Sequence, residues 1–320
     1  MSLAKRSIPE SVLGIIAYMK LRYYLKLSHI LVVLILIPNL IACTPSDRYT
    51  PTLENTPTDT PVPATPKATS EPVAARVNGE VISLSFFEGE VARYKLVMQE
   101  NPEGLTDEVQ VRELVINDLI DQVLLKQGAE AAGMQVSDEQ YQQEITRLVS
   151  ELGSEDALIN WKTEYGYDDQ QFEIAMRLSI AASWQKDQIA ATIPEAVEQV
   201  HVQQIFAYTS EGAQRALTSL NSGTDFDEIA WTYDPVTGGD LGWFPFGYLT
   251  VDEVDVVAFS LGVGEYSQVI ESRLGYHIIK VLEKNSAYPL MADARVFLQR
   301  QAVNDWLRIS REQAEIEITY

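Results

Sequence analysis

The chain has 320 residues, 46% of them hydrophobic and 22% charged, an ordinary globular composition in a length that suffices for two domains with their own cores. Acidic side chains outnumber basic ones by 46 to 24, a formal net charge of −22, and because such a surface repels phosphate backbones we expect no nucleic acid partner. One cysteine, Cys43, and three histidines, His29, His201 and His277, exclude an internal disulfide and leave too few ligands for a metal centre rich in cysteine or histidine.

The N-terminal segment has the layout of a secretion signal. From Met19, an alternative start, the chain carries three basic side chains and then an apolar run at 30–37 that is too short to span a bilayer comfortably. Residues 40–43, Leu-Ile-Ala-Cys, resemble the lipobox of bacterial lipoproteins, in which the chain is cut before the cysteine and lipid is attached to its thiol. We therefore expect residues 1–42 to be a removed signal peptide and Cys43 to anchor the protein on the extracytoplasmic side of the bacterial cell membrane. An ordinary signal peptide, or an uncleaved membrane helix with an incidental cysteine, is the alternative.

Residues 43–73 predict an extended tether. Beyond Cys43 this stretch is dominated by threonine and proline, and it offers almost no apolar side chain for a core. Proline favours an extended backbone of about 3.1 Å per residue, so roughly 30 residues reach up to about 90 Å. We therefore expect the folded part to begin near residue 74, at a distance from its anchor.

Residues 74–195 predict a mainly helical domain behind a short hairpin. An Asn-Gly pair at 78–79 separates two strand-like runs, which is typical of a tight turn. Ser137 opens a capping box, and Gly153 stands where the end of that helix needs left-handed backbone. The expected helices are one capped by Ser83 or Ser85 that runs to about Gln99, and others at about 106–132, 138–152, 154–164 and 168–191.

Two stretches of this domain, VNGEVISLSFFEGEV (77–91) and LVINDLIDQVLLKQGAEAAGMQVSDEQY (114–141), resemble the N-terminal region of PrsA/SurA-type foldases. In those proteins a strand and several helices form a cradle for unfolded polypeptide, and the C-terminal segment packs back on the same domain. The resemblance therefore implies that residues 286–320, a helix followed by an alternating strand at 315–319, pack on the N-terminal domain with that strand near its hairpin. Residues 196–285 would then be an insertion.

Residues 196–285 have the element order of a small α+β unit. The expected elements are a strand at 200–208, helices at 210–221 and 226–231, a glycine-rich segment at 238–247, a helix at 252–260, and strands at 266–270 and 275–283. Four motifs follow one another here: GTDFDEIAWTYD, GGDLGWF, AFSLGVGEYSQVIES and GYHIIKVLE. Together they resemble the parvulin family of peptidyl-prolyl isomerases. The implied fold class is α+β, with a helical N-terminal chaperone-like domain completed by the C-terminal helix and an inserted parvulin-like domain of antiparallel sheet flanked by helices.

Prolyl isomerisation makes simple demands on a site. Rotation about a peptide bond costs about 18–20 kcal/mol because amide resonance is lost, and uncatalysed X–Pro bonds isomerise over tens to hundreds of seconds. No bond breaks, so the reaction needs no nucleophile, metal or redox cofactor, and we expect no cofactor. The site needs an apolar slot for the proline ring, beside polar groups that bind the twisted amide better than the planar one.

The parvulin resemblance implies which side chains meet these demands. The implied polar group is His277, Asp234, Gln204 and Ser272. The implied apolar floor is Leu241 and Leu249, with Val254 nearby. Trp243 and Phe244 are further substrate-binding candidates for a separate reason: aromatic residues cluster on the glycine-rich segment, where some belong to the core and one or two are expected to be exposed to clients. Without the motif, His277 in an apolar strand would more often be a satisfied buried histidine, and Asp234 before Pro235 would serve equally as a turn residue.

The segment also departs from the parvulin pattern. Gln204 stands where family members usually have a histidine, and a carboxamide can hydrogen-bond but cannot carry a charge. His201, three residues earlier on the strand, points to the opposite face. Leu249 and Val254 stand where methionine and phenylalanine are usual, and the loop at 234–238 is short. The resemblance therefore implies a weaker or differently tuned isomerase, and loss of activity stays open.

Three functions are compatible with these features. The first is an extracytoplasmic peptidyl-prolyl isomerase and foldase that acts on unfolded or partly folded secreted polypeptides with X–Pro bonds. The second is a membrane-tethered holdase chaperone with a vestigial, inactive parvulin domain. The third, a solute-binding lipoprotein of a transporter, fits the anchor and the tether but explains none of the four motifs.

Overall fold

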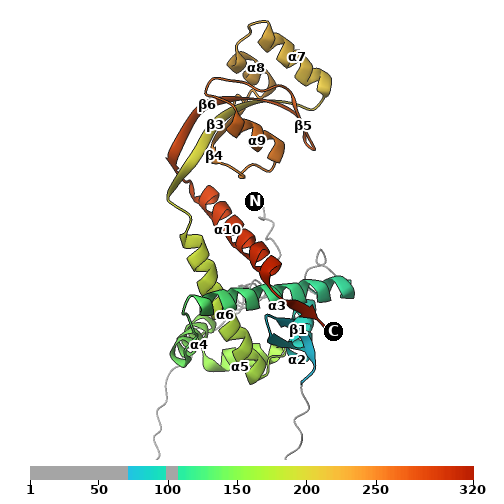
Figure 1. Ribbon diagram of the computed structural model, residues 1–320, viewed down its shortest axis with the longest axis vertical. Helices are drawn as coiled ribbons and strands as arrows, with labels where there is room; N and C mark the ends of the chain where they lie inside the picture. The colour runs from blue at the N-terminus through green and yellow to red at the C-terminus, as the bar shows by residue number, and fades with distance from the viewer. Residues whose placement is uncertain (1–70, 99–106) are drawn as a thin grey trace, which may run out of the picture. The chain divides into compact units, whose positions relative to one another are not determined.

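The computed structural model describes residues 71–98 and 107–320 (Figure 1). The expected signal peptide, Cys43 and nearly all of the tether lie outside these residues. Within the described part, no helix combines the length and the apolar character needed to cross a bilayer. The chain divides into two compact units. One contains the described residues up to Ala182 together with Gln313–Tyr320, and the other is Ser183–Glu312.

The first unit begins with a hairpin, which a strand from the far end of the chain joins. β1 (Val73–Val77) and β2 (Glu80–Ser83) pair antiparallel across Asn78 and Gly79. The φ angles of this Asn-Gly pair, 52° and 85°, are the left-handed values that a two-residue turn needs. β7 (Ile316–Ile318) pairs with the other side of β1, so the strand order is β2-β1-β7. The alternating C-terminal sequence thus forms a strand, and this strand lies beside the hairpin.

Helices make up the rest of the described first unit (Figure 1). They are α2 (Leu84–Met98), α3 (Glu108–Ala131), α4 (Asp138–Leu152), α5 (Glu155–Glu164) and α6 (Asp169–Ala191), the last of which continues into the second unit. The capping box at Ser137 is confirmed, because its hydroxyl accepts from the backbone N–H of Gln140, whose side chain accepts from the backbone N–H of Ser137. α4 ends at Gly153 with a φ of 95°. Fully buried side chains such as Phe87 and Ile120 form the core.

The second unit is built on an antiparallel sheet of order β4-β3-β6-β5. Its strands are β3 (Ala196–Ala207), β4 (Asp240–Pro245), β5 (Ile270–Ser272) and β6 (Gly275–Pro289), and its helices are α7 (Ser210–Asn221), α8 (Phe226–Tyr233), α9 (Asp252–Ser260) and α10 (Ala292–Gln313). Ile278 and Ile279, neighbours on β6, belong to separate cores: Ile278 packs with α7 and α8, and Ile279 packs with α9. α9 therefore covers one face of the sheet, while α7 and α8 cover the other (Figure 1).

The glycine-rich segment at 238–247 contains a strand, which the sequence did not predict. This strand, β4, pairs with residues 199–203 of β3. Gly239 has a φ of 74°, and a Cβ atom added to it would lie 1.9 Å from the carbonyl oxygen of Gln204. Glycine is therefore required here for a close backbone contact, as well as for a turn. The strand expected at 266–270 is also displaced, to β5.

The C-terminal segment is divided between the two units. β7 lies in the first unit, whereas α10 up to Glu312 groups with the second. There the hydroxyl of Tyr248 donates a 2.8 Å hydrogen bond to Asp293, and its ring meets Phe297 edge-on with centroids 5.4 Å apart. We expected all of residues 286–320 to pack on the N-terminal domain. The helix differs from that expectation, because these contacts attach it to the second unit.

Candidate active site

The backbone register brings most of the expected polar residues to one face of the second unit's sheet. Gln204 of β3 lies opposite Ile279, which is two residues from His277 on β6. Paired residues of antiparallel strands point to the same face, and Ile279 belongs to the core under α9. Gln204 and His277 therefore lie on the α9 face. Ile270 of β5 is paired with His277, so Ser272, two residues further along, reaches the same face.

His277 is held between Gln204 and Ser272. Its Nδ1 lies 3.2 Å from Oε1 of Gln204, and its Nε2 lies 2.8 Å from Oγ of Ser272. Because an amide oxygen only accepts, the assigned geometry places the ring proton on Nδ1, and Nε2 then accepts from the serine hydroxyl. His277 is 5% exposed, and burial lowers the pKa of its imidazole against a smaller opposing effect of Glu253. The ring is therefore neutral at neutral pH.

The contact between Ser272 and His277 does not make the serine a nucleophile. In a hydrolytic triad the histidine is oriented by a carboxylate, which stabilises the imidazolium that forms. Here the uncharged carboxamide of Gln204 takes that place. Oγ of Ser272 is also engaged locally, since it accepts from the backbone N–H of Leu274 at 3.1 Å and lies 3.2 Å from the carbonyl oxygen of Gly275. The arrangement therefore suits binding and orientation rather than covalent catalysis.

Two of the expected apolar residues stand on the same face as the polar network. Leu241 of β4 and Leu249, in the loop before α9, are partly buried and pack on a core that includes Val254 and Ile279. Ile279 is the cross-strand partner of Gln204. Apolar surface and hydrogen-bonding groups therefore occur side by side on this face, as a proline ring and its amide require.

Asp255, which the sequence-based interpretation missed, fixes the loop that carries Leu249. Asp255 is 2% exposed, its Oδ2 accepts a 3.3 Å hydrogen bond from the backbone N–H of Leu249, and its carboxyl also bonds the backbone N–H of Gly247. Its Oδ1 has no partner among the described residues, and burial raises the pKa of the carboxyl. Little in the sequence signals this role, because Asp255 follows Asp252 and Glu253 as a third acid in the first turn of a helix.

Asp234 is committed to its own turn. It is the C-cap of α8, and its carboxylate accepts from the backbone N–H groups of Val236 at 3.0 Å and Thr237 at 3.2 Å, and from the Thr237 hydroxyl. These bonds, the one from the hydroxyl first, lower the pKa of Asp234 to about 2. Within the described residues no hydrogen bond joins its carboxylate to Gln204 or His277. The geometry supports the turn interpretation, in which Asp234 orders the loop that leads to β4.

Three of the expected substrate-binding residues are not exposed beside the polar network of His277. Phe244 is 0% exposed and Val254 is 2% exposed, so both belong to the core under α9 and their side chains do not reach a client. The prediction of direct contact is wrong for these two in this conformation. Trp243 precedes Phe244 on β4 and points to the other face, where its ring stacks on Tyr288 at 4.2 Å and on His201 at 5.6 Å between centroids. The same contact shows that His201 faces away from the site.

Beside His277 stands an aromatic wall that the sequence-based interpretation did not single out. The ring of Phe206 lies 5.0 Å from that of His277, and Tyr208, which is 84% exposed, meets Phe206 edge-on at 4.9 Å. Gly275 makes room for this wall, because a Cβ atom added to it would lie 2.9 Å from ring carbons of Phe206. The alternate spacing of Gln204 and Phe206 on β3 and of Tyr208 just after its end was the signal in the sequence.

Comparison with family models finds two matches along the chain. Residues 63–173 match the SurA-like N-terminal domain. Residues 188–285 match the PPIC-type PPIase domain. The second match contains Gln204, Ser272 and His277, so the network described above lies inside the PPIase-type domain.

Curated relatives carry two names. The chaperone SurA of Nitrosococcus oceani is 26% identical over 285 residues, which cover 77% of this chain and 65% of the relative. The foldase protein PrsA of Geobacillus kaustophilus is 29% identical over 197 residues, which cover 57% of this chain and 67% of the relative. The chain thus spans about two thirds of the length of these curated relatives.

Solved structures give similar matches. PrsA from Bacillus cereus is 23% identical, with 75% of this chain and 91% of that chain covered and a TM-score of 0.46. The parvulin of Nitrosopumilus maritimus is 31% identical, with 27% of this chain and 97% of that chain covered and a TM-score of 0.24.

Fold and family matches together define a class: α+β proteins that join a SurA-like N-terminal domain to a parvulin-type PPIase domain. Within this class, the curated proteins that the chain is similar to include ones named PrsA and SurA. The resemblance first inferred from the motifs is thereby confirmed.

Proposed function

We propose that this protein is an extracytoplasmic foldase, whose second unit catalyses cis–trans isomerisation of X–Pro bonds in unfolded or partly folded secreted polypeptides. The names chaperone and foldase, which its relatives carry, support clients of this kind. One observation carries the proposal: the neutral ring of His277, held between Gln204 and Ser272, lies on the sheet face that also presents Leu241 and Leu249.

Gln204 is the group that can act on the rotating amide. Its Oε1 accepts from His277, while its Nε2 makes no hydrogen bond with the described residues and keeps two N–H donors for a client. In the planar amide the nitrogen lone pair is delocalised, whereas in the twisted amide it is localised and can accept a hydrogen bond. A donor beside an apolar surface therefore binds the twisted state more tightly, which is what lowers the barrier. His277 and Ser272 then act as positioning residues for the Gln204 carboxamide.

The proposal is tested by the cis-to-trans relaxation of a proline peptide in the presence of the purified full-length protein. The wild type should accelerate relaxation, and Gln204→Ala and His277→Ala should each reduce the acceleration by about a hundredfold. His201→Ala is the matched control, because it removes a histidine from the opposite face and should leave the rate unchanged. Relaxation no faster than in buffer would refute the isomerase proposal.

A holdase chaperone with an inactive parvulin domain is the second candidate. Two observations favour it: Gln204 in place of a histidine, and a carboxylate of Asp234 that is fully engaged by its own turn. This candidate predicts that the wild type suppresses aggregation of an unfolded client without accelerating isomerisation. It also predicts that His277→Ala suppresses aggregation as well as the wild type. Loss of suppression in that variant would exclude a purely binding function.

We further propose that Cys43 carries a lipid that holds the protein at the membrane. The support is the signal-like sequence that precedes it, in which Leu-Ile-Ala-Cys at 40–43 follows an apolar run. The Thr/Pro-rich tether then lets the folded units stand away from the bilayer. Cys43→Ser should move the protein from the membrane fraction to the soluble fraction, and the N-terminal peptide of the wild type should show the added mass of acyl chains. Wild-type protein found in the soluble fraction would contradict the anchor.

A further inference from the structure

The aromatic wall of Phe206 and Tyr208 is a feature of the second unit that the proposed rotation of the amide does not use. Phe206 is partly buried beside His277, whereas Tyr208 is 84% exposed and touches Phe206 edge-on. The hydroxyl of Tyr208 makes no hydrogen bond within the described residues. A tyrosine this exposed contributes little to the core, so its ring is available to a bound polypeptide.

The order of residues along β3 indicates which part of a client meets this wall. The strand register places Leu241 of β4 beside residues 202–203 of β3. Gln204 comes next along β3, and Phe206 lies two residues, or about 7 Å, further on. A proline ring on Leu241, with its amide at Gln204, therefore leaves the preceding residue of the client on the side of Phe206. The aromatic wall thus borders the side chain of X in an X–Pro bond.

An acidic side chain acts on the same part of the site. Glu253 is an exposed residue in the first turn of α9, and the next residue, Val254, packs in the core that Leu249 joins. Burial lowers the pKa of His277, and the negative charge of Glu253 raises it by a smaller amount. The carboxylate is therefore close enough to act on that ring. Within the described residues, it makes no hydrogen bond and no ion pair.

The basic side chains on the neighbouring elements do not compensate this charge. Lys280 lies over a ring of α8, on the opposite face of the sheet, and Lys284 donates to a backbone carbonyl at the far end of α9. Arg273, in the turn between β5 and β6, makes no ion pair and no ring contact in the part of the chain that the structure describes. The aromatic wall and Glu253 are therefore both left for a ligand.

We propose that Phe206, Tyr208 and Glu253 form a subsite that selects X–Pro bonds in which X is lysine or arginine. The aliphatic stem of such a side chain packs on the aromatic wall, the rings attract its positive charge, and the carboxylate of Glu253 compensates it. A neutral X lacks the last two interactions, and an acidic X is repelled. The inference rests on the proposed isomerase function, which it narrows to basic segments of the client.

The test compares two short proline peptides that differ only at X, one with lysine and one with norleucine, in the isomerase assay with the full-length protein. Norleucine has the four-carbon stem of lysine without the ammonium group, so the ratio of the two kcat/KM values isolates the charge. At low salt the wild type should favour the lysine peptide by about tenfold. The subsite binds planar and twisted amides alike, so the preference should lie in KM and not in kcat. It should shrink in 1 M salt.

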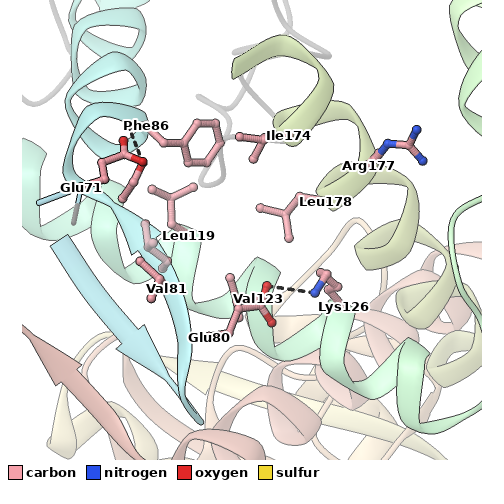
Figure 2. Close-up of a pocket in the computed structure, with 12 residues that line it drawn as sticks. Glu71, Glu80, Val81, Phe86, Leu119, Val123, Lys126, Ile174, Arg177 and Leu178 are labelled. Atoms are coloured by element: carbon pink, nitrogen blue, oxygen red, sulfur yellow. Dashed lines mark hydrogen bonds and ion pairs between the residues drawn. The ribbon is translucent and has the colours of Figure 1, made fainter. Parts of the chain in front are cut away.

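Variants separate the two parts of the subsite from the net charge of the protein. Glu253→Gln removes the carboxylate, and Tyr208→Leu keeps an apolar side chain but loses the ring; each should lower the ratio by about threefold. Glu71→Gln is the charge-matched control and should leave the ratio unchanged. Glu71 lies in the first unit, at a mainly apolar pocket of about 450 Å³ (Figure 2), where it accepts a hydrogen bond from the uncharged hydroxyl of Ser85. Equal losses in Glu71→Gln and Glu253→Gln would overturn the proposal, because net charge alone would then select the peptide.

The subsite and the isomerase function fail separately. A wild type that accelerates both peptides with equal kcat/KM would refute the subsite and keep the enzyme. A wild type that accelerates neither peptide would refute the enzyme, and fluorescence anisotropy with labelled versions of the same two peptides then tests the subsite by binding. Tighter binding of the lysine peptide that is lost in Glu253→Gln and kept in Glu71→Gln would support it. Equal binding of the two peptides would refute it.

Discussion

Replacement of Asp255 tests how the loop that carries Leu249 is held. Asp255→Ala removes the acceptor of the backbone N–H of Leu249, and a buried donor left without a partner costs about 1–3 kcal/mol. Asp255→Asn keeps an oxygen at the same place and should stay within about 1 kcal/mol of the wild type. Urea denaturation at neutral pH measures both differences. An asparagine variant as unstable as the alanine variant would refute the role assigned to this hydrogen bond.

The stability of the wild type and of Asp255→Asn, compared at different pH values, tests the effect of burying the Asp255 charge. Burial raises the folded-state pKa of Asp255 above its ordinary value of 3.8, so below 3.8 the carboxyl is protonated in both the folded and the unfolded protein. As the pH rises through the raised pKa, the folded protein must hold a buried charge, and its stability falls relative to the uncharged asparagine variant. The free energy of unfolding of Asp255→Asn minus that of the wild type should therefore increase with pH. A difference that decreased with pH would contradict the assignment.

Three further predictions concern the rest of the site. If His277 works as a neutral ring, isomerase activity should be constant at and above neutral pH and should fall on acidification through a pKa below 6.5; a midpoint above 6.5 in the pH–rate profile would be inconsistent with this. Gly239→Ala should lower the free energy of unfolding by about 2 kcal/mol or more, because its Cβ would collide with the carbonyl oxygen of Gln204 at a φ of 74°; unchanged urea denaturation would disprove the close contact. Asp234→Ala should destabilise the protein at neutral pH but progressively less as the pH falls from 3.8 to about 2, because a carboxyl with a lowered pKa stabilises the fold only while ionised. A loss of stability that did not depend on pH would contradict a stabilising role for the hydrogen bonds of the Asp234 carboxylate.

The helix boundaries were predictable because local chemistry sets them. Ser137 and Gly153 delimit α4 through a capping box and a left-handed residue, and both act within one turn of the chain. α7 occupies the predicted residues, Ser210–Asn221. The position of His277 was predictable for a different reason, namely that its motif resembles a family in which the strand pairing is fixed.

The features that the sequence did not predict have a common physical cause: they depend on contacts between separate segments of the chain. The glycines of β4 indicate loops locally, and only the pairing with β3 makes the segment a strand. Asp255 has the sequence context of an exposed first-turn acid, and nothing in the sequence shows that its carboxylate turns back to Leu249. Phe244 and Trp243 could be separated into core and opposite face only once the register of β4 was known. α10 could be assigned to the second unit only through its contacts with Tyr248.

The central claim is that a client amide rotates faster when it lies between Gln204 and the apolar edge formed by Leu241 and Leu249. Exchange NMR on an X–Pro peptide at equilibrium, with a catalytic amount of full-length protein, tests it most directly. The account predicts exchange cross-peaks between the cis and trans proline signals with the wild type, and their disappearance with Gln204→Ala. Cis and trans signals that exchange no faster with the wild type than in the peptide alone would contradict it.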